Sequence, residues 1–469
     1  MEIAGHAPPD SPVLESLSVE ALLTWEFDSD PNGIYERLRG KYGAVAPVGL
    51  MGVPVWLVLD YQDVLEVLRN ENVWRRDIRY WRARNEGLVP RDWPLLPGYE
   101  VRGTMFMDAE EHQHFRRTHQ SALRPFQSPH TPQGRALLAS VTQYTDDLVA
   151  LLAAESGMTG FVDLCAQYTR PLLLMVTAKL FGFWGELEDE LVMDMWRMVD
   201  GGADAGPATG RILEAMTRLA AHRRTNPGDD LPAHMMRANP QLSDEQLGRE
   251  LLTAAIYLND ATGSMVANTL LEVLLGNAAV RRSLSNGQLG DTLNRVALVN
   301  PPIANLPLRF AARDVRLGRF WMRAGDPVTV SVAAAHQNLV AISPSALATS
   351  DISTRAHLGW GAGPHQCPSA ARELAGMIGT AAVARIFEHF ENAELMLPYD
   401  QLSWRSGPSV RGLRLLPVRY ALRESARPER YVMSAQDGGG IRATQQSATP
   451  GAEAKGVLSS LRRLMFGRR

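Results

Sequence analysis

The sequence predicts a mainly α-helical fold with a few small β-sheets, and three observations support this. The chain has 469 residues, 45% of them hydrophobic and 21% charged, which is the composition of a large globular protein. A proline-free apolar segment at 247–275 is long enough to form a buried central helix. Strand-like segments are short and scattered and do not alternate regularly with helices, which disfavours a doubly wound parallel sheet.

Composition narrows the class of protein further. The 48 Lys and Arg against 51 Asp and Glu give a net charge of −3, so no global field attracts nucleic acid. Two cysteines cannot form a disulfide framework or a four-thiolate zinc site. The first residues lack a signal-peptide pattern, and no apolar run is long enough for a membrane span. We therefore expect a reduced, cytoplasmic protein.

The elements can be predicted in chain order. Two strands are expected at 44–50 and 53–60 around a glycine-containing turn, followed by a helix at 61–68. The region 137–275 has helical spacing interrupted by loops, and its last part is the central helix. Short strands return at 311–332, where apolar residues fall at period two, and a helix is expected at 368–390.

The predicted domain organisation has one large domain. Residues 1–30 form a lead rich in Pro, Ser and Asp, and the domain follows at 31–422. Residues 423–454 have the composition of a flexible linker. The chain ends at 455–469 in a short basic amphipathic stretch, which suits an anionic membrane surface or the apolar groove of a partner. A disordered charged end is an equally good interpretation of this tail.

The most informative segment runs from 357 to 368, with the letters HLGWGAGPHQCP. Gly361 and Gly363 carry no Cβ, so they allow a tight turn and a close approach to a flat ligand. Cys367 comes just before a predicted helix, where the free N–H groups and the helix dipole stabilise a thiolate. This is the environment of a metal-binding thiolate, although a lone cysteine is more often simply buried. Cys165 has that plain apolar context, and we assign it no role.

The segment resembles the haem-binding signature of the cytochromes P450. The matching pattern is Trp360-Gly-x-Gly-x-His365-x-Cys367, with Trp360 where the family usually has Phe and Ser369 where it usually has Gly. The resemblance continues in the same order from Glu36 to Tyr420. It implies the P450 fold, with the long central helix over a haem b and the Cys367 thiolate as the proximal iron ligand.

Other segments resemble the parts of the family that hold the haem propionates. His112 and Arg116 lie four residues apart on a predicted helix, so both face the same side. Without Cys367, a solvated charged helix face would be the preferred interpretation of this pair. Arg309 lies in a segment similar to the strand whose arginine meets a propionate, and His365 belongs to the signature. The segment 402–413 resembles the C-terminal hairpin of actinobacterial members.

The chain departs from the family in the helix that normally carries a glutamate three residues before an arginine. Arg295 is present, but Thr292 occupies the glutamate position. The second arginine that pairs with this glutamate is also replaced, with Thr349 at the matching position. Joint loss is physically reasonable, because removing one partner of a buried ion pair costs roughly 3–5 kcal/mol. Asp291 or Asp351 could supply a substitute carboxylate, and the chain resembles an actinobacterial subset that lacks the glutamate.

The central helix departs from the family as well. The family normally has a glycine, an acid and a threonine there, which shape an oxygen-binding groove and relay protons. In our alignment Asp260 matches the acid, Ala261 replaces the threonine and Leu258 replaces the glycine. A shift by one residue would bring Thr262 to the threonine position and lose the acid. Asp260, Ala261 and Thr262 are therefore the candidate catalytic positions, although Asp260 is equally well explained as a carboxylate satisfied by a neighbouring side chain.

The resemblance implies a monooxygenase that acts on a small organic molecule with electrons from a ferredoxin and its reductase. Arg117, Arg124 and Arg372 could form a basic dock for this acidic carrier, although a solvated face is the simpler interpretation. The substrate pocket is expected to use the tryptophan-rich segment 74–97 and Met193–Met198. The altered central helix and the extra tail also leave open a haem-binding regulatory or assembly protein with little turnover.

Overall fold

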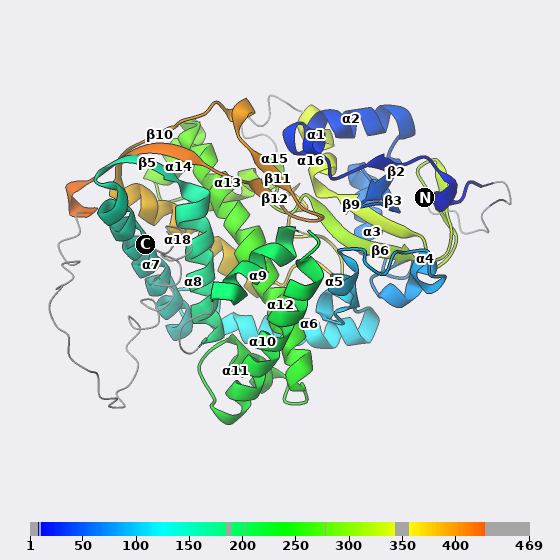
Figure 1. Ribbon diagram of the computed structural model, residues 1–469, viewed down its shortest axis with the longest axis horizontal. Helices are drawn as coiled ribbons and strands as arrows, with labels where there is room; N and C mark the ends of the chain where they lie inside the picture. The colour runs from blue at the N-terminus through cyan, green and yellow to red at the C-terminus, as the bar shows by residue number, and fades with distance from the viewer. Residues whose placement is uncertain are drawn as a thin grey trace.

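The computed structural model describes residues 8, 11–183, 189–200, 202–276, 278–342 and 356–426. Within these residues a helical body lies beside a smaller β-rich region that holds the N-terminal strands (Figure 1). The predicted fold class, mainly α with small β-sheets, is confirmed. Thr349, Asp351, most of the predicted linker and the whole predicted tail lie outside the described residues.

The β-rich region contains a six-stranded sheet with the order β1-β2-β3-β9-β6-β4. Its strands are β1 (Glu20–Ala21), β2 (Val45–Leu50), β3 (Val53–Val58), β4 (Trp74–Arg75), β6 (Asn305–Ala311) and β9 (Pro327–Ser331). The strands β2 and β3 form the predicted hairpin, and Gly52 in its turn has a φ of +87°. The strand β9 pairs in parallel with β3, so the middle of the sheet joins distant parts of the chain.

The segment predicted as an N-terminal lead takes part in this region. It supplies β1, and Leu14, Leu22 and Phe27 are each at most 2% exposed. These three side chains are spaced too irregularly to form a periodic pattern, so their burial could not be predicted.

Three smaller sheets are formed elsewhere. One has the order β10-β13-β5, and the other two are the pairs β11-β12 and β7-β8. The bounds are β5 (Thr159–Asp163), β7 (Val315–Leu317), β8 (Phe320–Met322), β10 (Phe390–Leu395), β11 (Trp404–Ser406), β12 (Arg411–Leu413) and β13 (Pro417–Leu422). The pair β11-β12 is the predicted C-terminal hairpin. The strands β5 and β10 were not predicted, because each buries a single side chain and has no apolar alternation.

Helices make up most of the remaining structure. Their bounds are α1 (Trp25–Ser29), α2 (Pro31–Tyr42), α3 (Tyr61–Arg69), α4 (Arg82–Asn85), α5 (Leu96–Glu100), α6 (Ala109–Leu123), α7 (Pro132–Ser156), α8 (Arg170–Phe181), α9 (Asp189–Asp200), α10 (Ala205–Thr225), α11 (Leu231–Ala238), α12 (Asp244–Ile256), α13 (Gly263–Leu274), α14 (Ala278–Ser285), α15 (Leu289–Val299), α16 (Val332–Ile342) and α18 (Ser369–His389). None of the helices in the described residues has the length and apolar character needed to cross a membrane.

The predicted central helix is present and consists of α12, a π-helical turn at Tyr257–Thr262 and α13. Its start is fixed by a capping box between Ser243 and Gln246. The π-helical turn was not predicted, and such turns inside α-helices occur frequently at functional sites.

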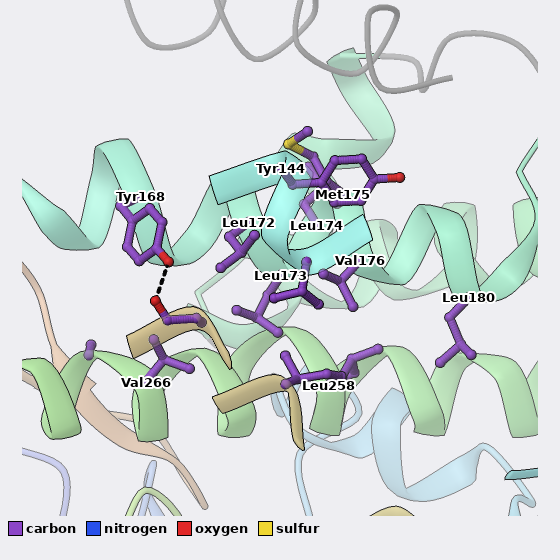
Figure 2. Close-up of a cluster of buried hydrophobic side chains, with 14 of the residues drawn as sticks. Tyr144, Tyr168, Leu172, Leu173, Leu174, Met175, Val176, Leu180, Leu258 and Val266 are labelled. Atoms are coloured by element: carbon purple, nitrogen blue, oxygen red, sulfur yellow. Dashed lines mark hydrogen bonds between the residues drawn. The ribbon is translucent and has the colours of Figure 1, made fainter. Parts of the chain in front are cut away.

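The helix α8 packs between the central helix and neighbouring helices of the body. Figure 2 shows its apolar side chains with Leu258 and Val266 of the central helix facing them. In the same view the hydroxyl of Tyr168, which lies just before α8, donates a hydrogen bond of 2.7 Å to the carbonyl of Ala382 in α18. The central helix is thereby held by packing on the face that carries α8.

Candidate functional site

A cavity lies between the central helix, α6, the segment around β6 and the loop before α18. The centres of water molecules fit within about 240 Å³ of it. Much of its wall is apolar and includes Met105, Leu258, Met265, Ile303 and Leu306. An apolar cavity with a few convergent polar groups is the usual form of a small-molecule site.

Cys367 lines this cavity at the end of a tightly turned loop. Its amide donates a hydrogen bond of 2.8 Å to the carbonyl of Trp360, which closes the loop. Gly361 and Gly363 have φ angles of +71° and +69°, so both adopt the left-handed conformation that favours glycine. A Cβ on Gly363 would also lie 2.5 Å from the carbonyl oxygen of Leu68. The close approach at Gly363 is therefore to the backbone of α3, whereas we had expected an approach to a flat ligand.

The charge state of Cys367 differs from the sequence expectation. Burial raises the pKa of its thiol to about 11, and the positive charges of Arg372 and Arg116 offset only part of this effect. The helix dipole does not suffice here, because α18 begins at Ser369, two residues later. A metal cation would deprotonate the thiol, since coordinating thiols lose their proton.

A set of buried cationic and imidazole side chains faces the cavity from the other elements. Arg309 on β6 is 2% exposed, and its Nε and Nη1 have no hydrogen-bond partner among the described residues. The same holds for Nδ1 of His112 on α6 and for Nε2 of His365. The two imidazole rings stack with their centroids 3.8 Å apart. These buried donors require acceptors, and a ligand that carries carboxylates would supply them.

The electrostatics of the set support the same conclusion. Burial, together with the charges of Arg116, Arg76 and Arg309, lowers the pKa of His112 to about 4. Burial and the charge of Arg76 also hold the pKa of the Arg309 guanidinium well below its usual range. The charges of Arg309, Arg76 and Arg116 raise one another's energy, and Asp108 and Glu71 offset this only in part for Arg309. The residues present therefore fit a haem, whose two propionates are carboxylates.

The structure brings the residues predicted to contact the propionates together at one cavity, and a further arginine lies there with them. Arg116 lines the cavity and donates a hydrogen bond to the carbonyl of Gln366, beside Cys367. Arg76, directly after β4, was not predicted; it is 4% exposed, lines the cavity, and has an Nε without a partner in the described part of the chain. Its Nη1 donates a hydrogen bond of 3.0 Å to the carbonyl of Pro307. An arginine that follows a two-residue strand has no signal in the sequence that separates it from a solvated one.

The three candidate catalytic positions of the central helix do not share one face. Ala261 and Thr262 line the cavity, and the Thr262 hydroxyl donates a hydrogen bond of 3.2 Å to the carbonyl of Tyr257. Asp260 instead lines a second cavity and forms an ion pair with Arg405 of β11. This placement differs from a catalytic acid over the haem and agrees with the alternative, a carboxylate satisfied by a neighbouring side chain.

Apart from Arg76, the named residues of the expected substrate-binding segments lie elsewhere. Trp74, Trp81 and Trp93 are buried in hydrophobic core clusters, where Trp81 stacks on Phe310 at 5.4 Å. In α9, Met195, Trp196 and Met198 line the second cavity. The prediction took aromatic content as a sign of a ligand pocket, whereas large aromatic side chains are most often used to fill a core.

Arg295 has a partner that was not predicted. Its Nε lies 3.7 Å from Oε2 of Glu272, on the neighbouring helix α13, whereas we had expected Asp291 or Asp351. Asp351 lies outside the described residues. Burial raises the pKa of Glu272, and the charge of Arg295 opposes this. Thr292 is 2% exposed, and its hydroxyl has no hydrogen-bond partner among the described residues.

A thiol and a set of buried polar groups without partners at one cavity of a mainly helical fold are what a haem-thiolate site requires. No family model matches the chain. It is 28% identical over 409 residues to cytochrome P450 107B1 of Saccharopolyspora erythraea, covering 84% of this chain and 96% of the relative. It is 27% identical over 413 residues to 2-hydroxy-5-methyl-1-naphthoate 7-hydroxylase of Streptomyces carzinostaticus, covering 85% and 97%.

Solved structures agree with this. CYP154C4 from a Streptomyces species superposes with a TM-score of 0.72 at 24% identity, covering 86% of this chain and 98% of the other. CYP154A1 from Streptomyces coelicolor gives a TM-score of 0.70 at 25% identity, covering 87% and 100%. Over at least 84% of its length the chain is similar in sequence to cytochromes P450, and it has their fold. These relatives support an oxidoreductase of the monooxygenase type, whose cofactor is a haem held through its iron by a cysteine thiolate.

Proposed function

We propose that the protein oxidises a small organic molecule at a haem whose iron is bound by Cys367. The observation that carries this proposal is the cavity that has the Cys367 thiol and the unpartnered donors of Arg309, His112 and His365 in its wall. When bound, the haem supplies the activation of dioxygen. The other residues of the site bind the haem and orient the substrate.

The donors divide into two roles. His112, Arg116, Arg309 and His365 bind the propionates, with Arg76 as a fifth donor, and hydrogen bonds between charged partners are the stronger kind. Gly361 and Gly363 give the cysteine loop its turn, as their positive φ angles require.

The central helix provides an apolar wall that orients the substrate and a hydroxyl that can form a hydrogen bond. Leu258 and Ala261 give the wall an apolar surface, and Thr262 supplies a hydroxyl. This hydroxyl donates a hydrogen bond to the carbonyl of Tyr257, so its lone pairs remain available to accept a hydrogen bond from substrate or water. Asp260 stays on the far side of the helix, where Arg405 holds it.

Electrons would come from a ferredoxin and its reductase. Arg117 and Arg124 are exposed at α6 and its C-terminal end, and Arg372 lies close enough to Cys367 for its charge to lower the pKa of the thiol. These three arginines support a basic dock on the cysteine side of the site for an acidic carrier.

The carbon monoxide spectrum of the reduced protein tests the iron ligand. We expect the red-shifted absorption of thiolate-bound haem in the wild type and in Cys165→Ser, because Cys165 is buried away from the cavity. We expect Cys367→Ser to lose it. A normal spectrum in Cys367→Ser would remove the basis of the proposal.

A second function is a haem-binding regulatory or assembly protein with little turnover. It is favoured by Leu258 and Ala261, which stand in the cavity wall where the family has its glycine and threonine. Consumption of NADPH with a generic ferredoxin pair over a broad substrate panel separates the two. A thiolate-type spectrum without substrate-dependent consumption supports the second function.

The tail at 455–469 is proposed to bind an anionic membrane surface reversibly. The support is its sequence, in which apolar residues fall near one helical face and arginines surround them.

A further inference from the structure

A carboxylate that the proposed mechanism does not use is buried beside the cavity. Glu250 on α12 is 1% exposed. Its Oε1 accepts a hydrogen bond of 2.9 Å from the amide of Thr104, and its Oε2 accepts one of 2.6 Å from the Thr104 hydroxyl. Nε2 of His119 on α6 lies 2.6 Å from the same Oε2. The segment at Thr104, the helix α6 that follows it and the distant helix α12 therefore meet at one side chain.

The residues bound in this way form part of the cavity wall. The segment 101–107 connects α5 to α6, and within it Thr104 and Met105 line the cavity. The sulfur of Met105 accepts a hydrogen bond of 2.8 Å from the hydroxyl of Tyr257. A Cβ on Gly103 would lie 3.1 Å from the hydroxyl oxygen of Thr253. Three consecutive residues of the segment are thus held against the central helix.

The hydrogen bonds of Glu250 also fix the position of the cavity wall. Burying a carboxylate costs several kcal/mol unless it is well hydrogen-bonded, and an apolar side chain at 250 would avoid that cost. Two of the hydrogen bonds of Glu250 are made to Thr104. The free-energy cost of burying the carboxylate is therefore offset only while the segment 101–107 lies in this position. Bonds of this kind fix a wall before the ligand arrives, which reduces the entropy lost on binding.

We propose that Glu250 is a positioning residue that holds the wall at Thr104 and Met105 closed against the central helix and so limits the size of the ligand that the cavity admits. His119 orients the carboxylate from the side of α6. The proposal rests on the proposed function only in taking this cavity as the substrate site.

Hydrogen exchange of the haem-bound, full-length protein tests the closure. In Glu250→Leu we expect the amides of 103–107 to exchange at least about tenfold faster, because a charge-assisted hydrogen bond contributes roughly that factor or more. Glu250→Gln should stay near the wild type, since its carbonyl can still accept from the Thr104 amide. Thr142→Val is the matched control, because the hydroxyl of Thr142 donates to the Leu138 carbonyl within its own helix, α7, at 3.2 Å and lies outside the cavity wall.

Spectral titration with two iron-binding azoles tests the effect on ligand size, using imidazole as the small probe and clotrimazole as the bulky one. We expect the ratio of their dissociation constants to shift toward clotrimazole by about threefold or more in Glu250→Leu, and not in Glu250→Gln. If Glu250→Leu does not fold, Thr104→Val, which removes one hydrogen bond, should shift exchange in the same direction by less. Unchanged exchange and an unchanged ratio in a folded variant would overturn the proposal. A wild type that shows no azole spectrum contradicts the proposed function, while the exchange result still decides the role of Glu250.

Discussion

Arg309 and Arg76 place two positive charges side by side in the interior of the protein. Each guanidinium is at most 4% exposed, and burial together with the neighbouring charge lowers the pKa of Arg309. A buried cation is tolerated only when something compensates it. The carboxylates of Asp108 and Glu71 act on Arg309 and supply part of the compensation, and the haem propionates would supply more. These two arginines are therefore a sensitive test of the propionate assignment.

We expect Arg309→Ala and Arg76→Ala each to weaken haem binding by roughly 10- to 100-fold, because each removes a charge-assisted hydrogen bond. The measurement is the haem content of the purified variants and the rate at which they lose haem to a scavenging apoprotein. Arg316→Ala, an exposed arginine on β7, is the control and should match the wild type. Haem retention by Arg309→Ala equal to that of the control would refute its role.

Single residues also show why the site was only partly predictable. Cys367 and His365 were found because they stand at fixed spacing in one short segment. Glu250, Glu272 and Arg405 were not, because the partner of each comes from a distant part of the chain. The two residues of a buried ion pair have no fixed spacing in the sequence, so their pairing becomes visible only in the folded structure.

At the scale of elements, the geometry of the central helix explains the placement of Asp260. The sequence predicted this helix from its length and apolar content, and both are borne out. Successive residues of a helix point about 100° apart, so Asp260 can face Arg405 while Ala261 and Thr262 line the cavity. A family alignment matches residues by position and does not show which of them points away from the cavity.

The helix α15 offers a test of the missing glutamate. Thr292→Val should raise the free energy of unfolding by about 1 kcal/mol, since it removes a buried hydroxyl that has no partner among the described residues. Thr292→Glu should be neutral or lower it slightly, because the nearby Arg295 already has Glu272. Thermal and denaturant unfolding of both variants would check the signs. A clear gain in stability from Thr292→Glu would contradict the joint loss of the original pair.

The contact between α7 and α18 predicts a pH-dependent contribution to stability. Burial alone would raise the pKa of Asp146, but hydrogen bonds from Arg385 and His389 outweigh it, so the pKa of this carboxyl is lowered in the folded state. Such a group stabilises the fold above its unfolded pKa of about 3.9, and the stabilisation is lost as pH falls through the lower folded value.

Asp146→Asn should therefore cost about 1 kcal/mol at pH 7, as expected for a partly exposed ion pair. We expect the difference from wild type to stay constant between pH 7 and 5 and to shrink below about pH 4, measured by denaturant unfolding. Asp400→Asn, at an exposed carboxyl, serves as the control. A difference that persists undiminished at pH 3 would count against the assignment.

At the scale of the whole molecule, the fold class was predictable because helical segments are long and apolar, while the sheet order was not. The strands β2 and β3 were found as a local hairpin, but their pairing with β9 joins Trp56 to Val328. Local periodicity carries no information about a partner so far away. The lead at 1–30 was underestimated for the same reason, because β1 is a strand only by its pairing with β2.

The tail gives a prediction for the intact chain. We expect the full-length protein to co-sediment with anionic vesicles weakly and in a salt-sensitive way, and a truncation after Arg442 to stay in solution, because a single short basic helix binds anionic lipid reversibly. Neutral vesicles are the control and should bind neither protein. Equal binding of both proteins to anionic vesicles would exclude the tail as the membrane contact.

The pairing of β3 with β9 also has a consequence for the protein while it is being made. Trp56 leaves the ribosome 272 residues before its partner Val328, which at roughly 5–20 residues per second is a delay of about 15–50 s. During that time the hairpin β2-β3, whose side chains are nearly all buried in the finished sheet, has an open edge and an uncovered apolar face. The nascent chain therefore exposes this edge to aggregation for far longer than a protein whose sheet forms from consecutive strands, and its yield on overexpression should respond to slower synthesis at low temperature.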